Sequence, residues 1–566
     1  MRVSWILLRH VSLELWRHLL LTTVILVLVT AFGVTVQHYA RGKLSAFDTL
    51  TFMGLASVPM LAYALPFAGC FAATLAYHRL VQERELMAAH AGGMSLPALL
   101  APAAATGLAL SVALSGLNEQ VIPRFLHQMA EVISTQAASL ISRAIGQGEA
   151  VQAQGFMIYA DEAIRLPKGD GGAQARLRLF GPHVLQLNED GSVKNWGAGA
   201  TAVVWIMPPR EGDLPGLRVS EVIYSVEEAV GDAGPVADGR VGSLSGALQM
   251  PGGVSDDPKF LTFGELREAR RNPDPLSLVD TPRRDLAFHL AQRRVMDRLV
   301  SEIRARGSAQ LRGPDGERLI VRTGGIAWSD EPPGWRLEPR RTGLDAGTIE
   351  IERYRPGASG TRAVERFEAA GARVSAALTG DPGDRGLALT IVAREVRTAL
   401  AQPEAGRERL GGMRQQATFG PLQIEDDPVA ECLAMSSGTL LAEIEARNDR
   451  LGYEDRFLAP PAEVLRDRLS DLDREILSKQ HERMALSVAT LVMVIGGALA
   501  AVRFQNTPPL VVFLWSFFPA LGTVLAISGG QQMTHDFGVP GLAMLWGGVA
   551  ALALAAAGTF VLAARH

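Results

Sequence analysis

The chain has 566 residues, of which 48% are hydrophobic and 20% are charged, and its mean hydropathy is +0.14. These values indicate that apolar and polar segments are separated along the chain, as in a membrane protein with a large water-exposed part. The formal net charge of −4 excludes a general nucleic-acid-binding surface, which needs a basic excess. Cys70 and Cys432 fall in an apolar and a polar segment, so no disulfide framework is predicted.

Six segments are long and apolar enough to cross a bilayer, whose hydrocarbon core needs about 20 residues per helix. The run from Leu19 to Val36 is longer than the core of a signal peptide and lacks a small-residue cleavage site, so the first span is predicted to remain uncleaved. Three spans precede a polar region at about residues 119–482, and three follow it. The spans are predicted at about 18–37, 51–77, 95–117, 484–502, 510–530 and 540–563.

The distribution of basic residues predicts the orientation of these spans. The short segments on one side carry most of them, and the short loops on the other side carry only Arg41 and Lys43. The positive-inside rule then places both termini in the cytoplasm and the polar region outside. The basic residues on the predicted cytoplasmic side are Arg2, Arg9, Arg17, Arg79, Arg84, Arg503 and Arg565.

Between the second and third spans lies a charged interval, residues 79–97, with the sequence RLVQERELMAAHAGGMSLP. It is predicted to form a short helix on the cytoplasmic face that ends at Gly92 and Gly93, before Pro97 begins the next helix. On a continuous helix, Glu85 shares one side with small residues, so it could accept a charged hydrogen bond from a partner's Arg or Lys. The alternative is a solvated turn between two membrane helices. The neighbours of Glu85 on that side are Val81, Ala88, Ala89 and Gly92.

The polar region has the alternation of apolar and polar residues that is typical of antiparallel strands with one solvated face. The Asp190-Gly191 pair predicts a hairpin turn. The alternation is clearest in RLRLF (176–180), HVLQL (183–187), TIEIERY (348–354) and LALTIV (387–392).

A weak internal repeat is visible in the polar region. Residues 259–272 lead into a charged amphipathic helix at about 285–306, and residues 434–448 lead into one at about 464–483. Each pair follows a β-rich stretch with a strand of small residues, GAGATAVVW in the first and EAAGARVSAAL in the second. The pattern favours two tandem β units. One larger β domain with an inserted helix is the alternative.

Several motifs of catalysis and cofactor binding are absent from the sequence. RGKLS lacks the upstream glycine and the hydroxyl residue of a phosphate-binding loop, so the chain is not expected to hydrolyse ATP itself. HERMA is not a zinc-protease motif, and no cysteine and histidine cluster has zinc spacing. GSLSG at 242–246 does not match a serine nucleophile elbow. We therefore predict no catalytic, cofactor-binding or metal-binding residues and no enzymatic activity.

The order of several segments resembles the permease family of lipopolysaccharide export, LptF/LptG, also called YjgP/YjgQ. The similarity covers both membrane halves and flanks the polar region. The segments that carry it are RELMAAHAGGMSLPALLAP (84–102), NEQVIPR (118–124), MSSGTLLAEI (435–444), HERMALSVATLVMVIGG (481–497) and FGVPGLAMLW (537–546).

The resemblance implies a multi-pass protein of the bacterial inner membrane with six transmembrane helices (3+3) and a periplasmic antiparallel β region that is jellyroll-like. The implied partners are a cytoplasmic LptB-like ATPase, a second permease half that is homologous or identical, a periplasmic β-jellyroll relay protein and a glycolipid substrate. The polar region is roughly twice the length usual in the family, which leaves open the β unit that acts as the relay. The implied domains are 1–118 with a coupling helix at 80–93, 119–482 with β units at about 150–306 and 307–482, and 483–566.

The resemblance also implies roles for two groups of residues. Glu85 matches the acidic residue of the coupling helix, and Gly93 matches the glycine that ends it. Basic residues at the outer end of the first span face the lipid cavity in the family. The ATPase-coupling residues are then Glu83, Arg84, Glu85, His90, Gly92 and Gly93, and the lipid-binding residues are His38, Arg41 and Lys43.

The expected function is thus that of a permease subunit that extracts lipopolysaccharide or a related glycolipid from the inner membrane and passes it to a periplasmic β-jellyroll. The alternatives are a membrane-anchored periplasmic enzyme and a receptor or structural β domain on a six-span anchor. An enzyme would need an acid, base, nucleophile or metal constellation in the polar region, and the sequence has no recognisable one.

Overall fold

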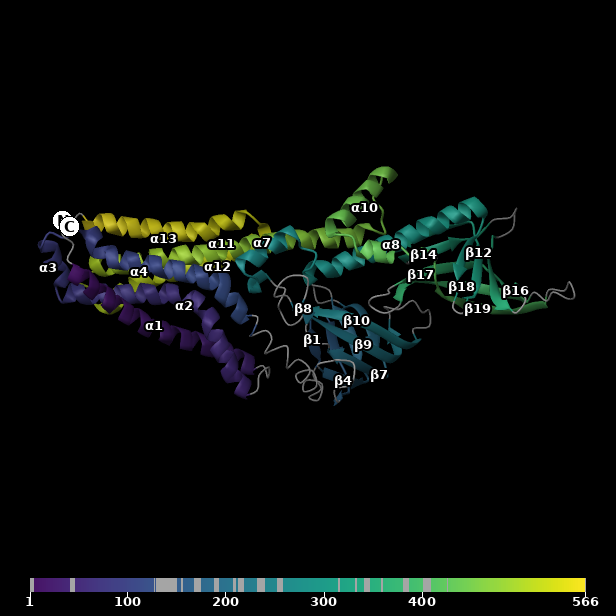
Figure 1. Ribbon diagram of the computed structural model, residues 1–566, viewed down its shortest axis with the longest axis horizontal. Helices are drawn as coiled ribbons and strands as arrows, with labels where there is room; N and C mark the ends of the chain where they lie inside the picture. Colours follow the sequence, from purple (N-terminus) through teal and green to yellow (C-terminus); the bar gives the residue numbers. More distant parts are fainter. Residues whose placement is uncertain are drawn as a thin grey trace.

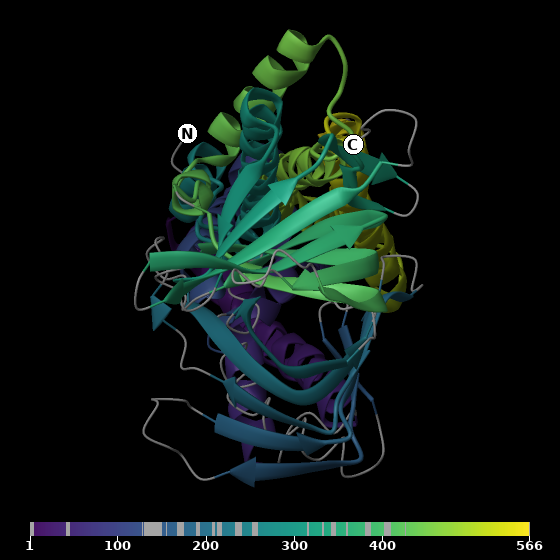
Figure 2. The same ribbon diagram turned by 90° about the vertical axis from the view of Figure 1, so that its right-hand side faces the viewer.

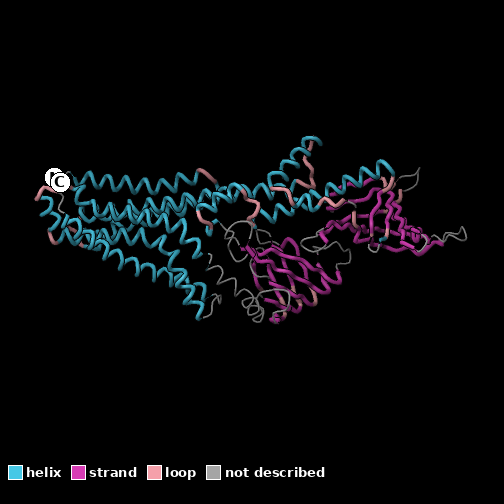
Figure 3. Tube along the Cα trace, in the orientation of Figure 1, coloured by secondary structure: helices cyan, strands magenta, loops and turns pink. Residues whose placement is uncertain are grey.

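The structure is a computed structural model in which two antiparallel β-sheets lie beyond one end of a helical bundle (Figures 1 and 3). It describes residues 5–40, 46–126, 128, 150–153, 156–166, 175–187, 193–206, 210–211, 218–231, 240–251, 258–313, 316–330, 333–340, 347–357, 360–379, 386–400, 409–424 and 426–564.

Six helices of the described chain are long and apolar enough to cross a membrane, which confirms the predicted 3+3 arrangement. The helices are α1 (Trp5–Ala40), α2 (Ala46–Gln82), α4 (Leu96–Gly116), α11 (Ala459–Arg503), α12 (Pro509–Phe537) and α13 (Pro540–Ala564). Helices α1, α2, α11 and α12 extend well beyond the predicted apolar stretches, because hydropathy marks only the apolar part of a helix, whereas α4 and α13 match the predicted spans to within one residue at each end.

Helix α11 is the central helix of the bundle. In its most apolar window 67% of the residues are buried, against 17% in α1 and 11% in α13, so α1 and α13 lie at the periphery. Gly497 allows the close approach of α2, because a Cβ at this position would lie 2.5 Å from the carbonyl oxygen of Cys70. Small residues at helix interfaces permit such contacts inside membranes.

Helix α11 also belongs to a second hydrophobic core. Its 45 residues make it about 68 Å long at 1.5 Å per residue. Leu465, Leu472 and Ile476 are buried in the core of the β region, whereas Val494 and Ala498 are buried in the helical bundle. One continuous helix therefore links the bundle to the β region.

The first β-unit is an antiparallel sheet of ten strands. Its strands are β1 (Val151–Ala153), β2 (Phe156–Tyr159), β3 (Glu162–Leu166), β4 (Ala175–Phe180), β5 (His183–Leu187), β6 (Val193–Ala198), β7 (Thr201–Ile206), β8 (Arg210–Glu211), β9 (Arg218–Gly231) and β10 (Arg240–Pro251).

The second β-unit is an antiparallel sheet of nine strands. Its strands are β11 (Ala309–Arg312), β12 (Arg318–Arg322), β13 (Gly325–Asp330), β14 (Pro333–Glu338), β15 (Ile349–Gly357), β16 (Gly360–Ala369), β17 (Gly371–Thr379), β18 (Gly386–Leu400) and β19 (Arg409–Leu422). Figure 2 shows this sheet in green above the first, which is blue.

The two sheets have the same strand order. The first runs β1-β2-β5-β6-β9-β7-β4-β3 with β10 on β9, and the second runs β11-β12-β15-β16-β18-β17-β14-β13 with β19 on β18. Strand β8 of the first β-unit has no counterpart. The matching strand orders favour two tandem β units over one larger β domain. The residue limits assigned to the two units remain a prediction.

The strands of small residues noted in the sequence form a bend in each sheet. In the first β-unit β6 and β7 pair with successive parts of β9, and in the second β16 and β17 pair in the same way with β18. The first bend lies at Gly199-Ala200, between β6 and β7, and the second lies at Ala370, between β16 and β17. Small residues suit such a position because a bent strand brings neighbouring backbones close together.

Each sheet is followed by a short helix with a side-chain N-cap and then by a long helix. After the first come η2 (Pro258–Phe260), α7 (Phe263–Arg271) and α8 (Ser277–Arg306), and after the second come α9 (Val429–Leu433), α10 (Ser437–Leu451) and α11. Thr262 caps α7 in a capping box with Glu265, and Ser436 caps α10. The repeat seen in the sequence therefore continues into the helices.

Helix α8 begins eight residues before the predicted start at residue 285. Asp280 stabilises this first part, because its carboxylate pairs with Arg283 at 2.5 Å and with Arg284 at 2.7 Å near the positive end of the helix dipole. The second predicted helix, 464–483, is a part of α11. It does not end at residue 483, because the apolar span continues the same helix.

A network of charges holds α8 against the second β-unit. The carboxylate of Asp455, only 6% exposed, accepts hydrogen bonds from Arg293 of α8 at 2.7 Å and from Arg447 of α10 at 3.0 Å. The guanidinium of Arg293 also lies over the ring of Trp335, 5.0 Å from its centroid. The core of the second β-unit therefore includes α8, α10 and the first part of α11.

Candidate coupling site around helix α3

Helix α3 (Glu85–Ala91) lies between α2 and α4 at the end of the bundle that carries both termini (Figure 1). The prediction of one continuous helix at 80–93 is wrong. Helix α2 ends at Gln82, and Arg84 adopts a left-handed conformation with φ 59° before α3 begins. The amide of Arg84 donates to the carbonyl of Val81 in a tight turn that interrupts the helix. Glu85 therefore does not share one side of a continuous helix with Val81, as predicted from the sequence.

The end of α3 agrees with the sequence prediction. Gly93 has φ +87°, a conformation that glycine adopts readily because it has no Cβ and that other residues rarely adopt. His90 contributes to the same turn, because its Nδ1 lies 3.0 Å from the carbonyl oxygen of Met94. Ser95 precedes α4, which has Pro97 in its first turn.

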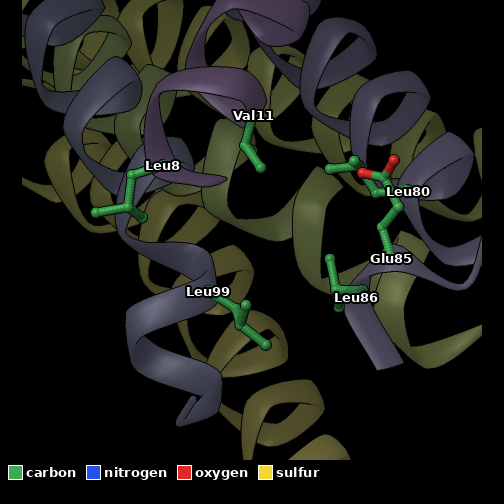
Figure 4. A pocket seen from close by; sticks show the side chains of 6 residues that line it. All are labelled: Leu8, Val11, Leu80, Glu85, Leu86 and Leu99. Carbon is green, nitrogen blue, oxygen red and sulfur yellow. The ribbon is translucent and has the colours of Figure 1, made fainter. Parts of the chain in front are cut away.

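A small apolar pocket adjoins the carboxylate of Glu85 (Figure 4). The side chain of Glu85 is 40% exposed, and its Oε2 lies 3.7 Å from Nε2 of His10 on α1. Glu85 thus combines a partly desolvated charge with an apolar surface at the rim of the bundle. The other residues that line the pocket are Leu8 and Val11 of α1, Leu80 of α2, Leu86 of α3 and Leu99 of α4.

The other acidic residue predicted for the site has an intramolecular partner. Arg79 contacts Glu83 at 2.9 Å and Glu14 of α1 at 2.5 Å. These pairs connect α1 to the end of α2, although exposed ion pairs of this kind contribute only about 0–1 kcal/mol each to stability. Glu83 therefore has a partner within the chain, and Glu85 is the acidic residue that lines the pocket.

The remaining predicted coupling residues are exposed, and we name the exposed residues of this segment the α3 surface. Arg84 makes no ion pair with any described residue, and its side chain faces solvent. The exposed members of the α3 surface are Arg84, Ala88, His90, Ala91, Gly92 and Gly93. The six predicted coupling residues all lie on the short segment 83–93 between α2 and α4.

Sequence reasoning missed the contribution of α1 to this site. His10, Glu14 and His18 follow one another at intervals of four residues, which places them on one face of a helix. That face meets Arg79 and Glu85. The spacing, with an arginine and a glutamate after the next span, could have suggested the contact.

The predicted lipid-binding residues cannot be placed in the same way. Arg41 and Lys43 lie outside the described residues. His38 is in the last turn of α1, and its side chain is also outside the described part.

At the other end of the bundle α11 carries a second charged cluster that the sequence did not reveal. Lys479 pairs with the buried carboxylate of Glu482 at 3.0 Å. Arg483 donates to the carbonyl oxygens of Leu261 at 2.8 Å and of Lys259 at 3.0 Å. These bonds fix the segment between the first β-unit and α7 to the central helix. Within the described residues, no three acidic, histidine or cysteine side chains form a group suited to a metal ion.

Six apolar helices and a large antiparallel β region define a multi-pass membrane protein. Residues 16–166 match the family described as lipopolysaccharide export system permease LptF/LptG, which confirms the family resemblance. The match includes most of α1, all of α2, α3 and α4, and strands β1 to β3 of the first β-unit. No curated protein matches the chain significantly.

Proposed function

We propose that the chain is the permease subunit of an ABC transporter that extracts lipopolysaccharide or a related glycolipid from the inner membrane. The observation that carries this proposal is the family match over residues 16–166, because it contains three membrane helices, the α3 surface and the first β strands. The chain delivers the lipid to the periplasmic side, where the positive-inside rule puts the β region.

A separate cytoplasmic ATPase binds the α3 surface in this proposal. The sequence lacks a phosphate-binding loop, so ATP hydrolysis takes place on another chain. The pocket beside Glu85 suits an apolar side chain of the partner, and the carboxylate suits an adjacent arginine or lysine. Short turns at Arg84 and at Gly93 connect α3 to α2 and to α4, so a movement of α3 is expected to act on both helices.

A second permease half, homologous or identical, completes the membrane part. Its expected contacts are α1 and α13, the peripheral helices. Apolar side chains of α1 such as Leu20, Leu28 and Phe32 are exposed over several turns. In a bilayer this surface contacts either lipid or the second half, and a cavity between the halves would receive the acyl chains of the substrate.

The first β-unit acts as the lipid relay in this proposal. At equivalent buried positions of the two sheets, the first β-unit has Leu177 where the second has the larger Trp335. Leu177 pairs with Val204 and with Arg165, whereas Trp335 in the second β-unit pairs with Val374 and with Trp328. The family match supports the same assignment, because its described β strands are β1, β2 and β3.

The interior of the second β-unit is occupied by its own side chains. Trp335 is buried, and its ring packs against Trp328 at 5.3 Å and against Phe457 at 5.2 Å, measured between ring centroids. Helix α8 contacts both edge strands, β11 and β13, and covers this side of the sheet. The second β-unit is therefore assigned a supporting role, and a separate periplasmic β-jellyroll protein receives the lipid from the first.

Arg41 and Lys43, assisted by His38, contact the anionic groups of the lipid. Each exposed contact contributes about 1 kcal/mol, compared with about 0.8 kcal/mol for every buried CH₂ of the acyl chains. Single substitutions should therefore have mild effects, and the double charge reversal Arg41→Glu/Lys43→Glu should reduce export severely. Normal export by the double variant at matched expression would make these residues simple membrane anchors.

Purification of the chain from native membranes tests the proposed function. We expect an ATPase subunit to copurify in a fixed ratio and a glycolipid to be enriched over the phospholipids of the membrane. Glu85→Ala provides the control, because it should lose the ATPase and retain the lipid. Isolation of the chain without a nucleotide-binding subunit, from cells that contain one, would contradict the proposal.

A further inference from the structure

Three arginines gather on the outer face of the second β-unit. Arg336 of β14 lies directly opposite Arg373 of β17, and Arg394 of β18 pairs with Gly371, two residues away from Arg373. The residues that alternate with them, such as Trp335 and Ala372, are buried in the core of the sheet. The three arginines therefore share the opposite face, which we name the arginine face.

Two of the three charges on the arginine face, those of Arg373 and Arg394, have no ion-pair partner among the described residues. Like charges on facing strands destabilise a sheet. The acidic residues of the same three strands are Glu338 of β14, two residues from Arg336, and Glu395 of β18, next to Arg394. Partial burial lowers the pKa of Arg373, and the positive charges of Arg394 and Arg336 lower it further.

The first β-unit does not have this cluster. The positions equivalent to Arg336, Arg373 and Arg394 in its sheet are occupied by Arg178, Val203 and Glu227. Two sheets of the same strand order thus differ at the positions that determine this charge. The fold itself does not require three arginines here.

We propose that the arginine face is a docking surface for an acidic region of another protein. The surrounding outward residues are small or short, including Ala327, Ser375 and Thr418, so a flat partner can approach closely. The second β-unit lies at the end of the molecule farthest from the chain termini (Figure 1). Several arginines on a flat surface suit carboxylates, which accept paired hydrogen bonds from guanidinium groups.

The first test uses the full chain in nanodiscs of zwitterionic lipid, with fluorescent poly-L-glutamate of about 20 residues as the probe. The variant Arg373→Val/Arg394→Glu introduces the residues of the first β-unit and should fold normally. We expect its affinity for the probe to be at least about tenfold lower, with a weaker dependence on salt. The matched control is Arg304→Val/Arg306→Glu, which changes the charge equally on exposed positions of α8 and should bind the probe as the wild type does.

The second test identifies the class of the native partner. A photo-crosslinking residue at Ser375, on the arginine face, should form a protein adduct in cells, and the adduct should disappear in the Arg373→Val/Arg394→Glu background. A lipid adduct at Ser375 would overturn the proposal. It would also be overturned by equal affinity of the wild type and the variant for poly-L-glutamate, because the arginines would then not determine binding. The ATPase and bound glycolipid should remain unchanged, so failure here is distinguishable from failure of the proposed transport function.

Discussion

Leu177 of the first β-unit and Trp335 of the second occupy the same position in two sheets of the same strand order, and each pairs with a valine of the next strand, Val204 and Val374. Both side chains are buried. The larger ring of Trp335 contributes to an aromatic cluster that fills the second β-unit. The two units thus share one fold and have different interiors.

Reciprocal substitution of these residues separates the roles of the two units. Leu177→Trp should narrow the interior of the first β-unit and reduce glycolipid transfer, with an overpacking cost of about 1–3 kcal/mol. Trp335→Leu should leave a cavity that destabilises the second β-unit by about 2–3 kcal/mol and should affect transfer less. Thermal unfolding and lipid transfer measured on both variants check the assignment. The reverse order of transfer defects, with both variants folded, would contradict it.

Glu85→Ala should weaken binding of the ATPase without affecting membrane insertion. Loss of a charge-assisted hydrogen bond in a partly desolvated site costs about 1.5–3 kcal/mol, which corresponds to roughly 10- to 150-fold in affinity. Glu14→Ala is the matched control, because it removes a carboxylate that pairs with Arg79 and does not line the pocket. Copurification and ATPase assays should show a defect for Glu85→Ala only. A similar defect in both variants would assign Glu85 a structural role.

The second β-unit should lose stability in acid because of Asp455. Burial raises the pKa of this carboxyl, but the hydrogen bonds and charges of Arg293 and Arg447 outweigh burial and hold the pKa below its ordinary value of 3.8. Because folding lowers the pKa of Asp455, the ionised carboxylate adds to the free energy of unfolding. This contribution is fully present above about pH 4 and is lost as the pH falls through the folded-state pKa. Unfolding measured between pH 6 and pH 2 should show this loss.

Asp455→Asn tests the assignment of the pH effect. It should remove this part of the pH dependence and cost about 1.5–3 kcal/mol at neutral pH, because it removes a buried carboxylate that accepts from two arginines, which then keep only Asp297 as an acidic partner among the described residues. An unchanged pH profile in the variant would show that other carboxylates determine the acid sensitivity.

Adjacent glycines of α11 should respond differently to the same substitution. A Cβ at Gly497 would lie 2.5 Å from the carbonyl oxygen of Cys70 and 2.8 Å from Oγ1 of Thr74, so Gly497→Ala must separate α11 from α2. A Cβ at Gly496 would meet no atom within 4 Å. Thermal unfolding in detergent should show a lower midpoint for Gly497→Ala and an equal or higher one for Gly496→Ala, since alanine favours helix. Equal destabilisation by both would contradict the packing of these helices.

Much of the architecture could be predicted because it depends on local patterns. Long apolar runs marked the six membrane helices, and alternation in segments such as RLRLF marked the strands. The small-residue strands also revealed the repeat. Their role as bends could not be predicted, because it depends on pairing with β9 and β18, which are distant in sequence.

The candidate site was predicted only in part for the same reason. Glu85 and Gly93 stand out in one short segment, and a continuous helix was the simplest assumption for it. The left-handed turn at Arg84 and the contact with His10 depend on how α1, α2 and α4 pack, which local periodicity does not encode. The filled interior of the second β-unit likewise depends on Phe457, which comes from a loop far along the chain.

Transport by a reconstituted complex tests the central claim most directly. The chain, its second permease half and the ATPase would be placed in proteoliposomes that contain lipopolysaccharide, with a periplasmic β-jellyroll protein as the acceptor outside. We predict that ATP drives transfer of lipopolysaccharide to the acceptor and that Glu85→Ala abolishes the effect of ATP. An intact complex that hydrolyses ATP and leaves lipopolysaccharide in the vesicles would contradict the account.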